Sequence, residues 1–316
     1  MSSNTLKMIG KRFVQSCITI VLVTLFVFIL IQLVPGNPVA NYLGATASQE
    51  QIDAMTHEYG FDRPAIVQYI SWITGLFRGT MGKSVSYQSE IADIIIPRLM
   101  VTLSMVVPAF IIGTLSGILL GVISALNRGK PIDTVICFFA NVFVSMPMFW
   151  LGMMGMLVLG LKLRVLPTSG YIPFDRNAYE WLRHMIMPIL IQALGVNAGF
   201  VRLTRSSMLE VIRQDYVTTA RAKGVKKRDV IFKHQLRNSL IPIVTVMGSR
   251  LGTMVGSTVL IESLFGIPGL GSVMMNGISN RDFMLVANGV LIISIFVAIC
   301  NLVVDILYGV IDPRTR

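Results

Sequence analysis

Long apolar blocks constrain the fold of this chain more than any other feature. Apolar residues make up 53% of the 316 positions and charged residues only 14%, whereas a soluble domain carries about 25% charged residues. Blocks of this length are typical of transmembrane helices. We predict an all-α polytopic membrane protein with six transmembrane helices, whose approximate bounds are 13–34, 99–126, 133–161, 184–205, 238–262 and 284–310.

The apolar blocks also predict the domain organisation. The N-terminal segment and the first span take up residues 1–34, a loop subdomain follows at 35–98, the five remaining spans form a core at 99–310, and residues 311–316 are a tail. Within the loop subdomain we predict helices over 49–59 and 65–77, the second directly after Pro64. The core contains a polar loop at 206–237.

Basic residues predict how the chain crosses the membrane. The net charge of +11 is concentrated in a few short segments, and residues 202–237 alone hold ten Lys and Arg against three acids. This is the pattern of cytoplasmic loops facing anionic membrane lipid, and it does not favour nucleic acid as a partner. We therefore expect 206–237 and both termini to be cytoplasmic, and 35–98 to be a small external subdomain.

A basic island at 204–224 carries its own helix signals. Ser207 and Glu210 fit a capping box, and Asp215 is predicted to be the N-cap of a short helix over Tyr216–Lys223. Gly224 stands where a left-handed residue ends a helix. Because an isolated helix of this length is marginal in water, it is expected to pack on its own bundle or on a partner.

The island also carries a family resemblance. Residues 215–224 (DYVTTARAKG), followed by 234–245 (HQLRNSLIPIVT), resemble the coupling-loop signature of ABC importer permeases. The resemblance is to the peptide/nickel branch and above all to the first permease subunit of dipeptide importers. It extends over the whole chain through segments 33–38 (LVPGNP), 59–64 (YGFDRP) with Gln68 and Tyr69, 265–271 (FGIPGLG), 301–308 (NLVVDILY) and 312–313 (DP).

This resemblance implies the type I permease fold of ABC importers and a place in the bacterial cytoplasmic (inner) membrane. The chain would form half of a translocation path for dipeptides or short peptides. Close relatives carry oligopeptides, glutathione, nickel or metal chelates instead. The implied partners are a second homologous permease subunit, two ABC ATPase subunits that bind ATP and Mg²⁺, and an extracytoplasmic substrate-binding protein.

The resemblance also implies which residues couple the chain to the ATPase. These are Glu210, Asp215, Tyr216, Thr219, Ala220, Arg221, Ala222, Lys223 and Gly224. The family pattern has Glu-Ala-Ala, three residues and then Gly, and the matching positions here are Thr218, Thr219, Ala220 and Gly224. The glutamate is missing, so a partner contact through that carboxylate is not expected in this chain.

Two other classes of protein were weighed against a transport subunit. An intramembrane enzyme needs a catalytic pair within the bundle, and the sequence offers none; it also lacks a Walker-type phosphate loop and a metal-ligand cluster. We therefore expect no catalytic, metal or cofactor site in this chain. An ion-coupled carrier that works alone usually needs acidic relays near the midplane, and the three acids nearest to the spans, Asp133, Glu262 and Asp305, are predicted near span ends.

One ionisable residue, Arg250, is predicted in the middle of a span. A charge at that depth is costly and should face the bundle interior or a water-filled path. Two interpretations remain open. Arg250 either lines the translocation path and meets an anionic group of the substrate, or it is a structural residue satisfied by backbone carbonyls or by the partner permease.

Overall fold

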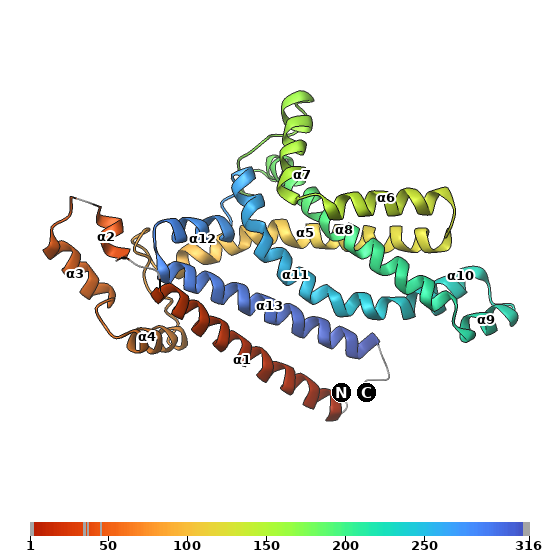
Figure 1. Cartoon of the computed structure of the whole chain (residues 1–316), viewed down its shortest axis with the longest axis horizontal. Coiled ribbons are helices and arrows are strands. Elements are labelled where there is room, and N and C mark those ends of the chain that lie inside the picture. Colours follow the sequence, from red (N-terminus) through yellow and green to blue (C-terminus); the bar gives the residue numbers. More distant parts are fainter. Residues whose placement is uncertain (1–2, 34–35, 37, 45, 312–316) are drawn as a thin grey trace. The chain divides into compact units, whose positions relative to one another are not determined.

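The computed structural model describes residues 3–33, 36, 38–44 and 46–311. Part of the 33–38 motif and the predicted tail from residue 312, with Asp312 and Pro313, lie outside this range. The described elements are helices, together with one isolated bridge between Lys83 and Glu90, which confirms the all-α prediction. Their bounds (Figure 1) are α1 Ser3–Leu33, α2 Pro38–Leu43, α3 Gln49–Tyr59, α4 Ala65–Phe77, α5 Ile91–Leu126, α6 Pro131–Ser145, α7 Met148–Gly155, α8 Ala178–Ile212, α9 Asp215–Ala222, α10 Lys227–Asp229, α11 Arg237–Phe265, α12 Leu270–Ser279 and α13 Phe283–Ile311, with π-helical segments η1 Met156–Lys162 and η2 Val230–Leu236.

Five helical stretches within the described residues are long and apolar enough to cross a membrane. They are Gly10–Leu33, Ile91–Leu126, Ala178–Ile212, Lys227–Phe265 and Phe283–Val304. A sixth crossing exists if the pair Pro131–Ser145 and Met148–Lys162, bent by 102°, counts as one span. The prediction of a single helix over 133–161 is therefore wrong, because two helices with a sharp bend between them occupy this segment. Met146 is extended, with φ −84° and ψ 132°, because the residue before a proline disfavours the helical region, and Pro147 follows it.

The chain divides into two compact units, each built from segments that are distant in the sequence. One unit combines residues 1–9, 103–267 and 299–316, and the other combines residues 10–102 and 268–298.

In the first unit, glycines bring two long helices into close contact. An added Cβ at Gly117 of α5 would lie 2.8 Å from the carbonyl oxygen of Asn197, and one at Gly121 would lie 2.8 Å from that of Val201, both in α8. Side chains larger than hydrogen would separate the helices. The four-residue spacing of Gly117 and Gly121 thus marks a packed interface between α5 and α8. In the same unit, Gly248 of α11 packs against Asn301 of α13.

In the second unit, helices of the loop subdomain pack on α1 and α13. Phe28, Trp72, Ala287 and Leu291 form one buried cluster, and Figure 1 shows α1 running along α13. Asp282 is only 1% exposed. Its carboxylate accepts hydrogen bonds from the Ser86 and Leu285 amides at 2.9 and 3.3 Å, so it fixes the loop at 84–86 to the start of α13.

The two helices of the loop subdomain have the predicted bounds, Gln49–Tyr59 and Ala65–Phe77. Ser48 and Gln51 form a reciprocal capping box at the start of α3, and Gly60 ends the helix in the left-handed region at φ 71°. The residue at the start of α4 is Pro64. Local signals of this kind act within one turn of the backbone, so the sequence suffices to find them.

Candidate functional site

The polar island begins inside a long helix. Ser207 and Glu210 both lie in α8, which continues to Ile212, and Ser207 is 7% exposed. The predicted capping box is therefore wrong. The Ser-x-x-Glu pattern starts a helix only where the chain before it is not helical. Residues 201–211 contain neither proline nor glycine, so nothing stops the span from running on.

The short helix α9 lies one residue earlier than predicted, at Asp215–Ala222. Its N-cap is Gln214, which makes no side-chain capping bond, so the prediction that Asp215 is the N-cap is also wrong. Asp215 instead lies in the first turn, where a negative charge interacts favourably with the helix dipole. At the other end Gly224 has φ 74°, and the Val225 amide donates to the Ala220 carbonyl at 3.2 Å. This confirms the glycine-ended C-terminus.

One face of α9 packs on the chain itself. Val217 is fully buried, Ala220 is 8% exposed, and both contact Val230 and Val211 in one apolar cluster. The Tyr216 hydroxyl accepts a hydrogen bond from the Asn238 side chain at 2.9 Å. These contacts attach α9 to the elements before and after it, which explains how so short a helix is stable.

The opposite face of α9 is open. Seven of the predicted coupling residues in and next to α9 are exposed, whereas Ala220 lies on the packed face; the exposed ones are Asp215, Tyr216, Thr219, Arg221, Ala222, Lys223 and Gly224. The Tyr216 residue is 42% exposed, although its hydroxyl is hydrogen-bonded to Asn238. Glu210 is exposed at the end of α8.

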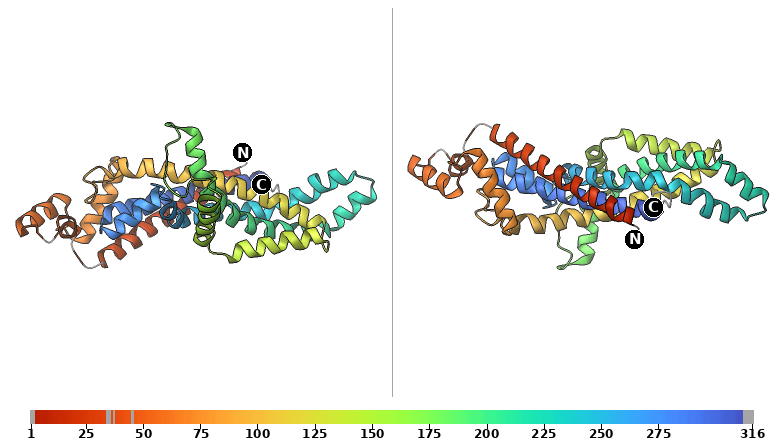
Figure 2. Two further views of the ribbon diagram at one scale, coloured as in Figure 1. Left: turned by 90° about the horizontal axis from the view of Figure 1, so that it is seen from above. Right: turned by 90° about the horizontal axis from the view of Figure 1, so that it is seen from below.

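Further basic residues precede and follow α9 in the sequence. Arg213, Lys226, Lys227 and Arg228 are also exposed. Figures 1 and 2 show α9 and α10 beyond the ends of α8 and α11. The result is a projecting, positively charged surface with one rigid short helix, which suits contact with an acidic partner surface.

An ion pair holds the end of α8 that carries α9. The Arg205 guanidinium contacts both carboxylate oxygens of Asp133 in α6, at 2.7 and 2.8 Å. Asp133 also accepts the hydroxyl of Ser124 and the Gly129 amide, the latter at 3.1 Å, and is 5% exposed. Sequence reasoning missed this cluster, because Asp133 and Arg205 are 72 positions apart and neither belongs to a local motif.

Arg250 is exposed in α11. Its guanidinium lies beside Gly199 of α8, where an added Cβ would be 3.8 Å from the nearer nitrogen. None of the ion pairs between described residues includes Arg250. Among the described residues the Arg250 charge therefore has no ion-pair partner, and both interpretations stay predictions.

Comparison with known proteins decides the family. Residues 117–316 match the family described as "Binding-protein-dependent transport system inner membrane component", and residues 5–106 match its N-terminal companion. The chain belongs to this family. It is 37% identical over 309 residues to a Brucella abortus protein provisionally named a peptide transport system permease, covering 98% of both chains. It is 35% identical to the dipeptide transport system permease DppB of Escherichia coli K12, covering 94% of this chain and 95% of that one.

Solved structures support the fold. The permease chain in an inward-facing structure of the MetNI methionine ABC transporter superposes with a TM-score of 0.54 at 18% identity, covering 69% of this chain and 96% of that chain. An amino acid ABC transporter gives a TM-score of 0.50 at 17% identity and covers 71% of this chain. The fold is thus that of ABC importer permeases, as the sequence resemblance implied.

Proposed function

We propose that this chain is the permease subunit of an ATP-driven importer of dipeptides or other short peptides in the bacterial inner membrane. The observation that carries the proposal is near full-length similarity to permeases named for peptide and dipeptide transport. A second homologous permease subunit would complete the translocation path. A substrate-binding protein would deliver the peptide from outside, and both termini of this chain would be cytoplasmic.

The open face of α9 is the proposed contact with the ATPase. Two separate ABC ATPase subunits would bind ATP and Mg²⁺, so this chain needs no cofactor of its own. Arg221 and Lys223 are exposed on α9 and offer positive charge to an acidic groove. Ala220 packs in the cluster with Val230 and is only 8% exposed, so we leave it out of the proposed contact set. The proposed contact set is therefore the exposed residues of α9 together with Gly224.

Motion would pass from α9 to the spans through fixed contacts. Val217 and Ala220 join α9 to η2, which leads directly into α11. The Arg205–Asp133 pair joins the end of α8 to α6. These contacts are buried or doubly hydrogen-bonded. A displacement of α9 by the ATPase would therefore move the adjoining ends of α8, α6 and α11 together rather than only a loop.

Charge reversal tests the contact. The double variant Arg221→Glu, Lys223→Glu should lose ATPase binding and peptide uptake by tenfold or more, because two attractive contacts become repulsive. The unfolding temperature of the purified chain should not change, since both side chains are exposed. The matched control is Lys162→Glu, Arg176→Glu, which changes the charge equally at exposed positions outside α9. Normal uptake by the α9 variant would refute the contact.

Arg250 is proposed to line the path between the two permeases. Arg250 is exposed in the middle of a predicted span and forms no ion pair with another described residue, which supports this role. A carboxylate of the passing peptide would be its transient partner.

A further inference from the structure

The loop subdomain contains a cavity of about 480 Å³ that the proposed coupling and transport roles do not use. It lies within the unit formed by residues 10–102 and 268–298. Its lining comes from the end of α3, the α3–α4 turn, the length of α4, the loop at 78–83, and Met284 of α13. Pockets for small molecules fall in this range of volume, about 300–1,000 Å³.

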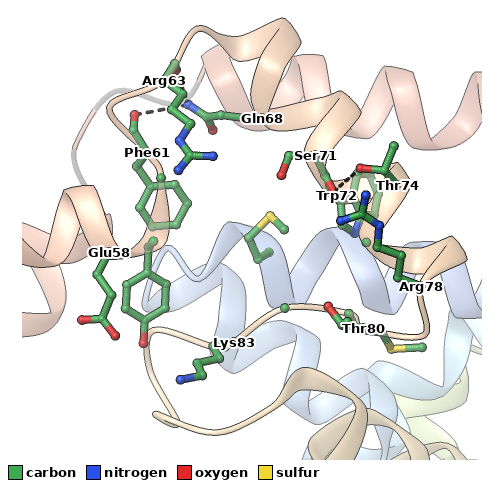
Figure 3. A pocket seen from close by; sticks show the side chains of 16 residues that line it. Glu58, Phe61, Arg63, Gln68, Ser71, Trp72, Thr74, Arg78, Thr80 and Lys83 are labelled. Carbon is green, nitrogen blue, oxygen red and sulfur yellow. Dashed lines mark hydrogen bonds between the residues drawn. The ribbon is translucent and has the colours of Figure 1, made fainter.

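Charged side chains from separate segments surround the cavity. Arg63 belongs to the α3–α4 turn, Arg78 is the C-cap of α4, and Lys83 follows in the loop. Figure 3 shows these three cations on different sides of one open space, with Glu58 of α3 at its edge. All four are exposed, and none of the ion pairs between described residues joins them. The cavity therefore has three cations and one anion that do not neutralise each other by contact.

A hydrogen-bonded turn and aromatic side chains form the walls of the cavity beside these charges. The Gln68 side chain donates to the Arg63 carbonyl at 2.7 Å and to the Phe61 carbonyl at 3.2 Å, which fixes the turn. The Tyr59 and Phe61 rings stack with centroids 6.0 Å apart. Trp72 is 4% exposed, and its indole N–H donates to the Asn288 side chain at 3.2 Å. The aromatic rings provide an apolar surface beside the charges.

The tyrosine at the rim is uncharged at neutral pH. The ordinary pKa of a tyrosine, about 10, already lies well above neutral pH, and burial together with the neighbouring Glu58 carboxylate raises the pKa of Tyr59 further. The phenol adds no negative charge to the cavity. The cationic side of the cavity is accordingly not weakened by a tyrosinate.

We propose that this cavity binds short zwitterionic peptides on the permease itself. The peptide carboxylate would bind Arg63, Arg78 and Lys83, its ammonium group would approach Glu58, and its backbone would lie against the aromatic wall. Arginine side chains suit carboxylates because their N–H groups form paired hydrogen bonds. The idea rests on the proposed function, since it assumes a peptide importer with residues 35–98 on the external side. It adds a peptide site outside the membrane spans.

Equilibrium binding to the full-length chain in detergent, without a binding protein, tests this site. The probe is radiolabelled Ala-Ala, compared with its C-terminal amide and its N-acetyl form. Ala-Ala should bind at least about tenfold more tightly than the amide, because the amide lacks the carboxylate. The variant Arg63→Gln, Arg78→Gln should weaken Ala-Ala binding to the level of the amide. The matched control, Arg176→Gln, removes an exposed arginine outside the cavity and should bind Ala-Ala normally.

A second variant guards against a general loss of folding. Glu58→Gln should weaken binding of Ala-Ala but leave binding of N-acetyl-Ala-Ala unchanged, since the acetylated peptide has no ammonium group. Unchanged Ala-Ala binding in the Arg63, Arg78 variant would overturn the proposal, even if the assembled importer still takes up peptides. Peptide uptake by the assembled importer is measured separately, so failure of the proposed function is seen independently.

Discussion

At the scale of single residues, Asp133 is a buried carboxylate that needs several hydrogen-bond donors. It is almost completely removed from solvent, yet Arg205, Ser124 and Gly129 supply donors to both of its oxygens. A buried carboxylate persists only when it is paired and hydrogen-bonded in this way. The costs of removing the two partners should therefore not add, because the first removal already leaves the other charge unpaired.

We expect Asp133→Asn to destabilise the chain by about 2 kcal/mol, because it leaves Arg205 unpaired while that side chain is partly solvated. The double variant Asp133→Asn, Arg205→Gln should lose less than the sum of the two single variants. Thermal unfolding of the purified chain measures both. The control is Asp229→Asn, which removes the exposed pair with Lys233 and should cost less than about 0.5 kcal/mol. Equal losses for Asp133→Asn and Asp229→Asn would contradict this account.

At the scale of elements, the sequence predicts those whose limits depend on neighbouring residues. Helices α3 and α4 are set by Ser48, Gly60 and Pro64, and all three signals are local. The turn at Gly224 is equally local. The Ser207–Glu210 capping box failed because the same letters occur inside a continuing helix, and only the preceding backbone distinguishes the two cases.

Other elements depend on contacts that a single sequence does not reveal. Pro147 was visible, yet a proline within an apolar block is compatible with a kinked span as well as with the 102° bend seen here. The π-helical segment η2 extends the fifth span back toward α9, where the sequence predicted loop. The Asp133–Arg205 pair forms only once α6 and α8 pack together. Long-range packing therefore determines these three features, two of which, η2 and the Asp133–Arg205 pair, hold α9 and the end of α8.

Helix contacts give a prediction at this scale. Gly121→Ala would place a Cβ 2.6 Å from the Thr204 Cβ and 2.8 Å from the Val201 carbonyl oxygen, so α5 and α8 must separate at a cost of about 1–3 kcal/mol. The higher helix propensity of alanine offsets about 1 kcal/mol of this loss in stability. Gly256→Ala is the matched control, since nothing in the described chain lies within 4 Å of its added Cβ. Thermal unfolding should show a loss for Gly121→Ala and none for Gly256→Ala. A stabilised Gly121→Ala would contradict the close packing.

At the scale of the whole molecule, one chain leaves surfaces that need neighbours. Leu115 and Leu119 of α5 and Leu260 of α11 are more than 60% exposed, at 63%, 61% and 63%. Apolar side chains of this kind contact either lipid or another membrane subunit. Lipid tails provide an apolar environment for the leucines. They do not stabilise the charge of Arg250, which is exposed on the same helix as Leu260. The proposed path shared with a second permease would accommodate both the leucines and the charge.

This reasoning gives a prediction for transport by the assembled importer. Arg250→Gln should reduce the maximal uptake rate of Ala-Ala about tenfold, while uptake of the peptide amide should change little, because only the free peptide carries a carboxylate for the guanidinium. Arg250→Lys keeps the positive charge and should retain most of the Ala-Ala uptake. A purely structural arginine would affect both peptides equally, since misplaced spans impede any solute. Equal losses for Ala-Ala and its amide would therefore assign Arg250 to helix packing and remove it from the path.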